Sequence, residues 1–167
     1  LIKAVAVFNL IGKVVSAVNQ APVPNIRLAL VNQSAATDVV VTSDKNGLFT
    51  GDLMPETDYL IRSENVTSSK CSAEFRGLST RGVVKDSIFQ ITVPLYCEGD
   101  IIKLGDIYYD LDKYNIRPDA AIILDKLLKI MNDYPKMKIE LRSHTDSRAS
   151  GPYNMKLSDN RAKSAAA

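Results

Sequence analysis

The 167-residue sequence predicts an α+β protein of two domains, an all-β sandwich followed by a smaller α/β domain. Three observations support this prediction. Residues 1–97 consist of short β-rich runs separated by turn signals, the polar segment Glu98-Gly99-Asp100 then interrupts the chain, and helical periodicity begins only after it. We therefore place the domains at residues 1–97 and 98–167.

The first domain is expected to contain about seven strands, which favours a sandwich. The runs rich in β-branched and aromatic residues are 12–18, 26–32, 39–42, 47–53, 58–64, 71–76 and 87–95. Proline or Asn-Gly marks the turns at 21–25, 44–47 and 54–57. Asp44 and Asn46 carry oxygen ligands but lack the spacing of a calcium loop, so we expect a tight turn there.

Two cysteines, Cys71 and Cys97, lie 26 residues apart. They either form a disulfide, worth about 3 kcal/mol on the loop-entropy model, or remain two buried thiols. Neither their number nor their spacing indicates a zinc site.

The second domain is expected to follow the order β-α-β-α. An extended run covers 101–109, and a helix is predicted over 118–133, with Pro118 in its first turn. Residues 138–145 alternate as a strand covered on one side, and a second helix should begin near Tyr153 or Asn154. The helix stripe consists of Ala121, Leu124, Leu127, Leu128 and Met131. Because no strand follows the second helix, we expect this domain to be incomplete at its C-terminus.

Composition excludes several classes of function. The 21 basic and 19 acidic residues give a net charge of +2, too balanced for general nucleic-acid binding, and no apolar run is long enough to span a membrane. The sequence offers no cofactor motif, metal-ligand set or catalytic constellation, so we expect a protein that is not an enzyme. His144, the only histidine, is expected to support a loop.

A candidate binding site combines Asp146, Asn154 and Arg161. Asp146 follows the predicted strand, and Asn154 and Arg161 are i, i+7 on one face of the second helix. A carboxylate beside a guanidinium suits a ligand that carries an ammonium and a carboxylate on one carbon. Alternatively, Asp146 and Arg161 pair with each other or cap the helix. Tyr108, Tyr109 and Tyr114 either line a sugar-stacking surface or belong to the core, and we expect the core.

Residues 105–162 resemble the OmpA C-terminal-like peptidoglycan-binding domain. The resemblance rests on the segment 107–113, the strand into His144-Thr145-Asp146, and Asn154 followed by Leu157-Ser158 and Arg161-Ala162. It implies non-covalent binding of peptidoglycan through the meso-diaminopimelate of its peptide stem. Asp146 and Arg161 would hold the zwitterionic end, with Thr145 and Asn154 as flanking partners and Asp112 as a weaker candidate. Ser143 replaces a common family glycine, and the family's later arginine-rich segment is not in this sequence.

Residues 1–97 resemble carboxypeptidase regulatory-like or transthyretin-like modules, which are non-catalytic spacers or interaction surfaces. The resemblance rests on the segments 12–15, 24–26, 42–49 and 53–55. The combination resembles Bacteroidetes-type envelope proteins, some of which serve gliding or type IX secretion. It implies a periplasmic, outer-membrane-associated protein anchored to the wall, or alternatively a scaffolding component that acts through contacts with other envelope proteins.

Overall fold

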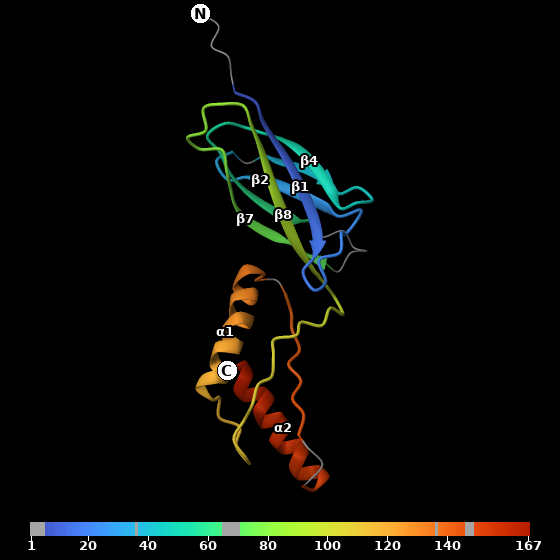
Figure 1. Ribbon diagram of the computed structural model, residues 1–167, viewed down its shortest axis with the longest axis vertical. Coiled ribbons are helices and arrows are strands. Elements are labelled where there is room, and N and C mark those ends of the chain that lie inside the picture. Colours follow the sequence, from blue (N-terminus) through green and yellow to red (C-terminus); the bar gives the residue numbers. More distant parts are fainter. Residues whose placement is uncertain (1–5, 36, 65–70, 136, 146–148) are drawn as a thin grey trace, which may run out of the picture. The chain divides into compact units, whose positions relative to one another are not determined.

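The computed structural model describes residues 6–35, 37–64, 71–135, 137–145 and 149–167. The chain divides into two compact units, Leu1–Ile101 and Ile102–Ala167 (Figure 1). The first unit contains all the assigned strands of the described residues, and the second contains both helices.

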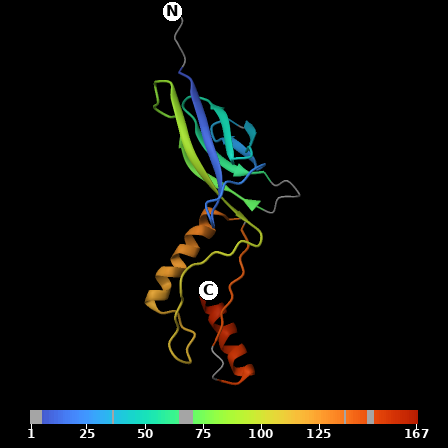
Figure 2. The ribbon, with the colours of Figure 1, turned by 45° about the vertical axis from the view of Figure 1, so that its right-hand side comes forward.

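Eight strands form two four-stranded sheets in the described part of the first unit, one strand more than predicted (Figure 1 and Figure 2). One sheet has the order β4-β1-β8-β6 and the other β3-β2-β5-β7. The strands are β1 (Phe8–Ser16), β2 (Arg27–Asn32), β3 (Asp38–Thr42), β4 (Leu48–Leu53), β5 (Asp58–Ser63), β6 (Cys71–Ser72), β7 (Glu74–Ser79) and β8 (Ser87–Cys97). Each of the seven predicted runs therefore contains a strand, although β1 begins four residues before the predicted Gly12 and ends two residues before the predicted Val18.

The core lies between the two sheets because alternate side chains of their strands point inward. Leu10 and Val14 of β1, Leu28 of β2, Ile61 of β5 and Val93 of β8 are all fully buried. β1 pairs antiparallel with β4 from Phe8 to Lys13, and it pairs parallel with β8 over its whole length. Gly12 of β1 is required because Phe49 of β4 lies over it, and a Cβ at Gly12 would be 2.0 Å from Phe49 Cζ.

The predicted run 71–76 is two strands because the chain changes sheets at Ala73. β6 pairs with β8, whereas β7 pairs with β5 in the other sheet, and Ala73 between them is buried. Cys71 and Cys97 face each other in the β6–β8 register and form a disulfide. This bond resolves the alternative that the sequence left open.

The turn at Asp44–Gly47 forms as predicted. The Asp44 carboxylate accepts hydrogen bonds from the backbone N–H groups of Asn46 and Leu48, each 2.8 Å long, and Gly47 has a φ of +74°. The Asp44 carboxylate oxygen thus holds the turn.

In the second unit, α1 (Pro118–Asp133) has the predicted bounds. Its buried face differs from the predicted stripe: Ala120 and Leu127 are buried, whereas Leu128 is 57% and Met131 39% exposed. The sequence contains two overlapping apolar stripes at helical spacing, and packing selects the one that continues into the buried Tyr134. The second helix, α2 (Gly151–Ala166), forms as predicted but begins two residues early, at Gly151.

The strands predicted over 101–109 and 138–145 are not formed in the structure. Exposure still alternates along both segments, with Ile139 and Leu141 on the more buried side and Lys138, Glu140, Arg142 and His144 exposed. The sequence therefore predicted correctly which side chains of 138–145 lie on the more buried side. A strand also needs a neighbouring strand at hydrogen-bonding distance, and an alternating pattern does not specify that neighbour. Instead of the predicted β-α-β-α order, the described residues of this unit have two helices, with one segment without a ladder before α1 and another between α1 and α2.

Candidate functional site

The candidate site is built on α2 and on the turn that precedes α1. Asn154 and Arg161 lie two helical turns apart on α2, and both are half-buried. The Asn154 backbone N–H donates to the Ser150 carbonyl at 3.0 Å, and its side-chain amide donates to the Ala149 carbonyl at 3.2 Å. Asn154 thus fixes the start of the helix that carries Arg161.

The Arg161 guanidinium is fixed by three contacts with the 109–113 segment. Its Nε donates to the Lys113 carbonyl at 3.0 Å, and its Nη2 donates to the Asp110 carbonyl at 3.4 Å. Its Cζ lies 4.8 Å from the centroid of the Tyr109 ring, a cation–π contact. A guanidinium has five N–H donors, so the two described hydrogen bonds leave donor capacity for a ligand.

Asp110 organises the turn that receives Arg161, and the sequence interpretation gave this residue no role. Its carbonyl accepts from the Lys113 N–H at 3.1 Å, and its carboxylate lies 3.5 Å from Lys113 Nζ and 3.0 Å from Arg117 Nη1. Aspartate is a preferred turn residue, and this signal was available in the sequence.

Asp112 lies in this turn with a φ of +62°. Its carboxylate accepts a hydrogen bond from the Tyr153 hydroxyl at the start of α2. A left-handed backbone is unusual for a non-glycine residue, although aspartate tolerates it better than most. The structure therefore places Asp112 in the turn that Arg161 contacts, while Asn154 lies on α2 about 10 Å along the helix axis from Arg161.

Of the other predicted site residues, Thr145 is half-buried at the end of the 138–145 segment, and Asp146 lies outside the described residues. The convergence of Asp146 with Arg161 therefore stays a prediction. His144 is exposed.

The three tyrosines differ in their surroundings. Tyr109 is half-buried against Arg161, and its hydroxyl donates to the Arg161 carbonyl at 3.0 Å. Tyr108 is 62% exposed and Tyr114 49% exposed, so the prediction that both belong to the core is wrong. Tyr108 lies in the 101–109 segment, which forms no ladder, and Tyr114 lies between the turn at 110–113 and α1.

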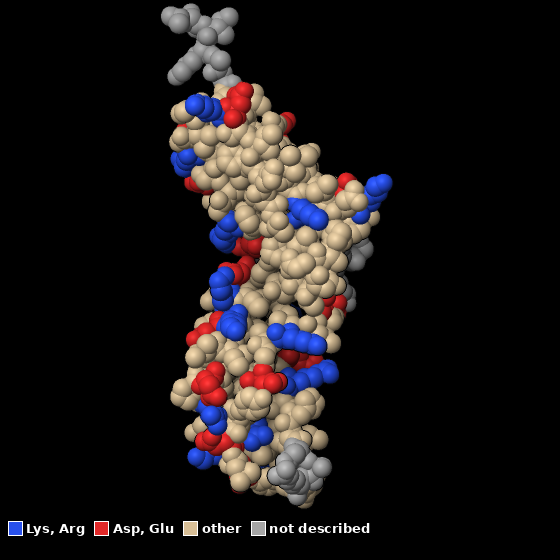
Figure 3. Space-filling view, in the orientation of Figure 1, with Lys and Arg blue, Asp and Glu red and all other residues tan. Residues whose placement is uncertain are grey.

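The protonation of the site follows from these contacts. Burial raises the pKa of the Tyr109 hydroxyl, and the neighbouring Arg161 charge opposes this shift. The hydrogen bond to Asp112 raises the pKa of Tyr153. The Arg117 guanidinium lowers the pKa of Asp119 through a hydrogen bond of 3.0 Å. Figure 3 shows acidic and basic side chains interspersed over this unit, without a large patch of one sign on the visible face.

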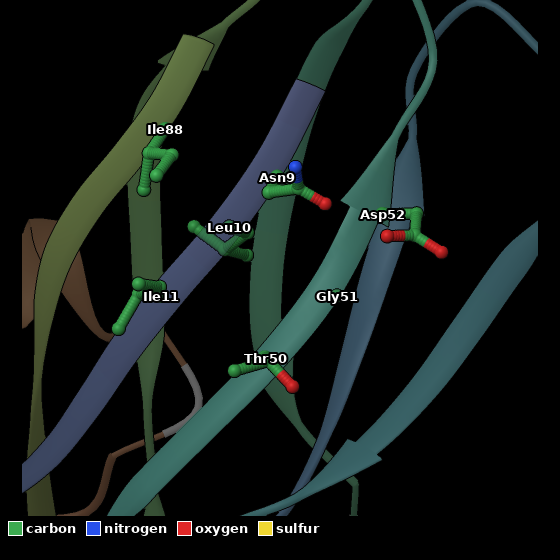
Figure 4. Close-up of a pocket in the computed structure, with 7 residues that line it drawn as sticks. All are labelled: Asn9, Leu10, Ile11, Thr50, Gly51, Asp52 and Ile88. Atoms are coloured by element: carbon green, nitrogen blue, oxygen red, sulfur yellow. The ribbon is translucent and has the colours of Figure 1, made fainter. Parts of the chain in front are cut away.

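A shallow hollow lies on the outer face of the first unit, away from these residues in the chain. Figure 4 shows Asn9 of β1, Thr50 and Asp52 of β4 and Ile88 of β8 around it. It contains no basic residue or aromatic ring, so it lacks the groups that bind carboxylates or stack on sugars.

The chemistry available at the candidate site is recognition by charge and hydrogen bonds. Within the described ranges, no group of three His, Cys, Asp or Glu side chains is arranged to hold a metal ion. Neither α1 nor α2 combines the length and apolar character that a helix needs to cross a bilayer. A half-buried guanidinium with a fixed orientation can grip a carboxylate with two parallel hydrogen bonds.

Comparison with known proteins shows which family this unit is similar to. The OmpA family model matches residues 108–167. The peptidoglycan-associated lipoprotein of Brucella melitensis biotype 1 is 37% identical over 62 residues, which are 36% of this chain and 37% of that protein. Outer membrane porin F of Pseudomonas fluorescens is 37% identical over 57 residues, which are 34% of this chain and 18% of the porin. The matched region thus spans much less than half of either relative.

Among solved structures, a putative carbohydrate-binding protein from Bacteroides uniformis is similar over 52% of this chain and 40% of that chain, with a TM-score of 0.38 and 13% identity. A TM-score this low does not establish a shared fold. The family match instead lies on the unit that carries Asp112, Asn154 and Arg161. Residues 108–167 therefore form an OmpA-like C-terminal domain.

Proposed function

We propose that this chain binds the peptide stems of peptidoglycan through residues 108–167 and thereby holds a cell-envelope protein to the wall. The proposal is supported by the OmpA family match and by relatives named peptidoglycan-associated lipoproteins. In this proposal the chain is a binding module and performs no covalent chemistry.

The observation that carries the proposal is the fixed Arg161 guanidinium. Two backbone carbonyls and the Tyr109 ring orient it before any ligand arrives. An oriented guanidinium loses little conformational freedom when it binds, so more of the interaction energy contributes to affinity. Its remaining donors suit a carboxylate.

The ligand we propose is the zwitterionic end of meso-diaminopimelate. Arg161 binds its carboxylate and Asp146 its ammonium, while Thr145 and Asn154 donate or accept flanking hydrogen bonds. Asp112, already bonded to Tyr153, contributes charge from the adjacent turn. Two charge-assisted contacts of about 1.5–3 kcal/mol each, set against the cost of association, give a micromolar to millimolar affinity. A polymeric wall compensates with many stems at high local concentration.

Calorimetric titration of the full chain with a meso-diaminopimelate stem peptide tests this proposal. We expect binding by the wild type, and at least tenfold weaker binding by Arg161→Lys, which keeps the charge but loses the planar fork. A lysine-type stem lacks the second carboxylate and should also bind at least tenfold more weakly.

The matched control is Arg76→Ala, which removes an exposed arginine from β7 in the first unit and should leave affinity unchanged. Circular dichroism checks that each variant is folded. If folded Arg161→Lys bound the stem as tightly as the wild type, Arg161 would not be the carboxylate ligand. If the folded wild type bound neither stem, the scaffolding alternative would replace wall binding.

For the first unit we propose a role as spacer or protein-interaction module of the carboxypeptidase regulatory-like kind, in a periplasmic, outer-membrane-associated protein of the Bacteroidetes type. A role in gliding or type IX secretion machinery is part of this hypothesis. Affinity purification of the full-length protein from its native envelope, with and without residues 1–97, tests it. Envelope partners that are retained only when residues 1–97 are present would support the interaction role, and an identical set of partners would exclude it.

A further inference from the structure

Strand β3 forms one edge of the β3-β2-β5-β7 sheet, and its free side carries unpaired backbone groups. It is antiparallel to β2, with Val39 opposite Leu30 and Val41 opposite Leu28. The flanking bonds, Ser43 N–H to the Ile26 carbonyl at 2.9 Å and Asn32 N–H to the Thr37 carbonyl at 3.4 Å, set which residues bond to β2.

Backbone bonding alternates along an antiparallel pair. Val39 and Val41 therefore direct their N–H and C=O groups toward β2, and Asp38, Val40 and Thr42 direct theirs away from it. The backbone groups of Val40 make no hydrogen bond to a described residue. An edge with this pattern can accept one more antiparallel strand.

The side chains of β3 do not protect this edge. Val39 is 54% exposed and Val40 42% exposed, and β3 contains no Lys, Pro or Gly. The opposite edge, β7, is protected by the charges of Glu74 and Arg76 and by a register shift in its pairing with β5. Strand edges that stay unpaired are usually blunted by charge, proline or a bulge. β3 has neither proline nor a bulge, and its one charged residue, Asp38 at its first position, is paired with Arg62 of the same sheet.

We propose that β3 pairs with β3 of a second copy of this chain, antiparallel and centred on Val40, to join two four-stranded sheets into one of eight strands. In this register Val40 bonds to its own symmetry mate, and Asp38 lies opposite Thr42 at both ends. The strand is therefore self-complementary, as a twofold interface requires.

Charge does not oppose this occupant. The two Asp38 carboxylates lie at opposite ends of the paired strands, about 13 Å apart along the strand direction. Each also has its own cation, because Arg62 Nη2 lies 3.4 Å from the Asp38 carboxylate. The net charge of +2 adds little repulsion between copies. Since a single strand pair buries less than a standard interface of about 1,600 Å², the dimer is expected to be weak and concentration-dependent.

Sedimentation of the full chain across about 1 µM to 1 mM tests the proposal. We expect the wild type to dimerise with rising concentration and Val40→Lys to weaken dimerisation at least tenfold, because two like charges would then face each other. Val84→Lys is the matched control, because Val84 is 83% exposed outside any strand and should leave the equilibrium unchanged. Thermal unfolding monitored for each variant separates loss of pairing from loss of fold.

The register is tested by cysteine cross-linking. Val40→Cys should form an intermolecular disulfide under mild oxidation, because directly opposite residues have Cα atoms about 5.5 Å apart. Thr42→Cys should not cross-link, since its two copies lie at opposite ends of the pair. A wild type that stayed monomeric throughout, a folded Val40→Lys that dimerised normally, or cross-linking through Thr42→Cys instead of Val40→Cys would overturn the proposal. The first of these results would leave an extended segment of another protein as the occupant.

Discussion

Tyr109 and Arg161 hold each other at two points. The Tyr109 ring lies 4.8 Å below the Arg161 guanidinium carbon, and the Tyr109 hydroxyl donates a 3.0 Å hydrogen bond to the Arg161 backbone carbonyl. One tyrosine therefore positions both the functional group of Arg161 and the helix backbone that carries it. The two residues are 52 positions apart in the sequence. Their contact therefore links the segment before α1 to α2 within the OmpA-like domain.

Replacement of Tyr109 should reveal the two contacts separately. Tyr109→Phe removes the hydroxyl bond but keeps the ring, and should lower the free energy of unfolding by about 1 kcal/mol. Tyr109→Ala removes both contacts and leaves space behind, and should cost about 2–3 kcal/mol. Chemical denaturation followed by circular dichroism measures both. Tyr108→Phe is the control, because Tyr108 is 62% exposed and its loss of a hydroxyl should have little effect. Equal stability of Tyr109→Phe and Tyr109→Ala would show that the ring contributes nothing.

The hydrogen bond from Tyr153 to Asp112 predicts a change in the pKa of Tyr153 when Asp112 is replaced. The acceptor raises the pKa of Tyr153 above its usual value near 10, so Asp112→Asn should lower it. Ultraviolet absorbance between pH 9 and 12 follows the change, with Tyr153→Phe identifying the signal. Asp106→Asn should instead lower the pKa of Tyr108, whose hydroxyl bonds to Asp106. A Tyr153 pKa that did not move in Asp112→Asn would contradict the hydrogen bond.

Burial of Tyr109 predicts a loss of stability at alkaline pH. Its pKa is raised in the folded state, so the folded protein binds this proton more tightly than the unfolded chain does. The contribution is fully present below the unfolded pKa of about 10 and is lost as the pH rises through the folded pKa. Thermal unfolding at pH 8 and pH 11 should therefore show a smaller alkaline decrease in Tyr109→Phe than in the wild type. An identical decrease would mean that other groups cause it.

The Cys71–Cys97 disulfide should stabilise the first unit. Its reduction, or the paired change Cys71→Ser and Cys97→Ser, should lower the free energy of unfolding by about 3 kcal/mol, because the bond closes a loop across 26 residues. Differential scanning calorimetry with and without reductant measures the shift. Reductant should have no effect on the double serine variant, and a shift that persisted there would have another origin.

Gly12 should tolerate no side chain. Gly12→Ala places a Cβ 2.0 Å from Phe49 Cζ and should cost about 1–3 kcal/mol through strain in the core. Addition of Phe49→Leu should recover part of this loss, which identifies the ring as the cause. Gly151→Ala is the control, since its Cβ would meet open space. Denaturant unfolding that found Gly12→Ala as stable as the wild type would contradict the packing of Phe49 on Gly12.

Sequence patterns predicted the local elements well because those elements depend on nearby residues. The bounds of α1 follow from Pro118 and the apolar spacing after it, and each β run is bracketed by turn residues. The division of residues 71–79 between two sheets was missed because Ala73 is an ordinary strand residue, and only its long-range partners reveal the change of sheet.

The shared helix face of two candidate site residues was predictable from the sequence, but the backbone contacts around Arg161 were not. The spacing of Asn154 and Arg161 indicated a shared helix face, and both residues are half-buried on α2. The carbonyls of Asp110 and Lys113, which hold Arg161, have no sequence signature, because every residue carries a carbonyl and only the path of the chain selects these two. The exposed Tyr108 was misjudged because periodicity indicates which face is apolar, not whether anything covers it.

The parallel pairing of β1 with β8 has a mechanical consequence. Phe8 lies at the start of β1 and Leu95 near the end of β8, and the two strands are in register from Phe8–Ser87 to Ser16–Leu95. A tension that pulls Phe8 and Leu95 apart draws these strands past each other in shear, so their hydrogen bonds must break together rather than one at a time. Stretching the first unit between these two points would therefore act on all of these hydrogen bonds at once, a geometry that suits a protein proposed to hold the envelope to its wall.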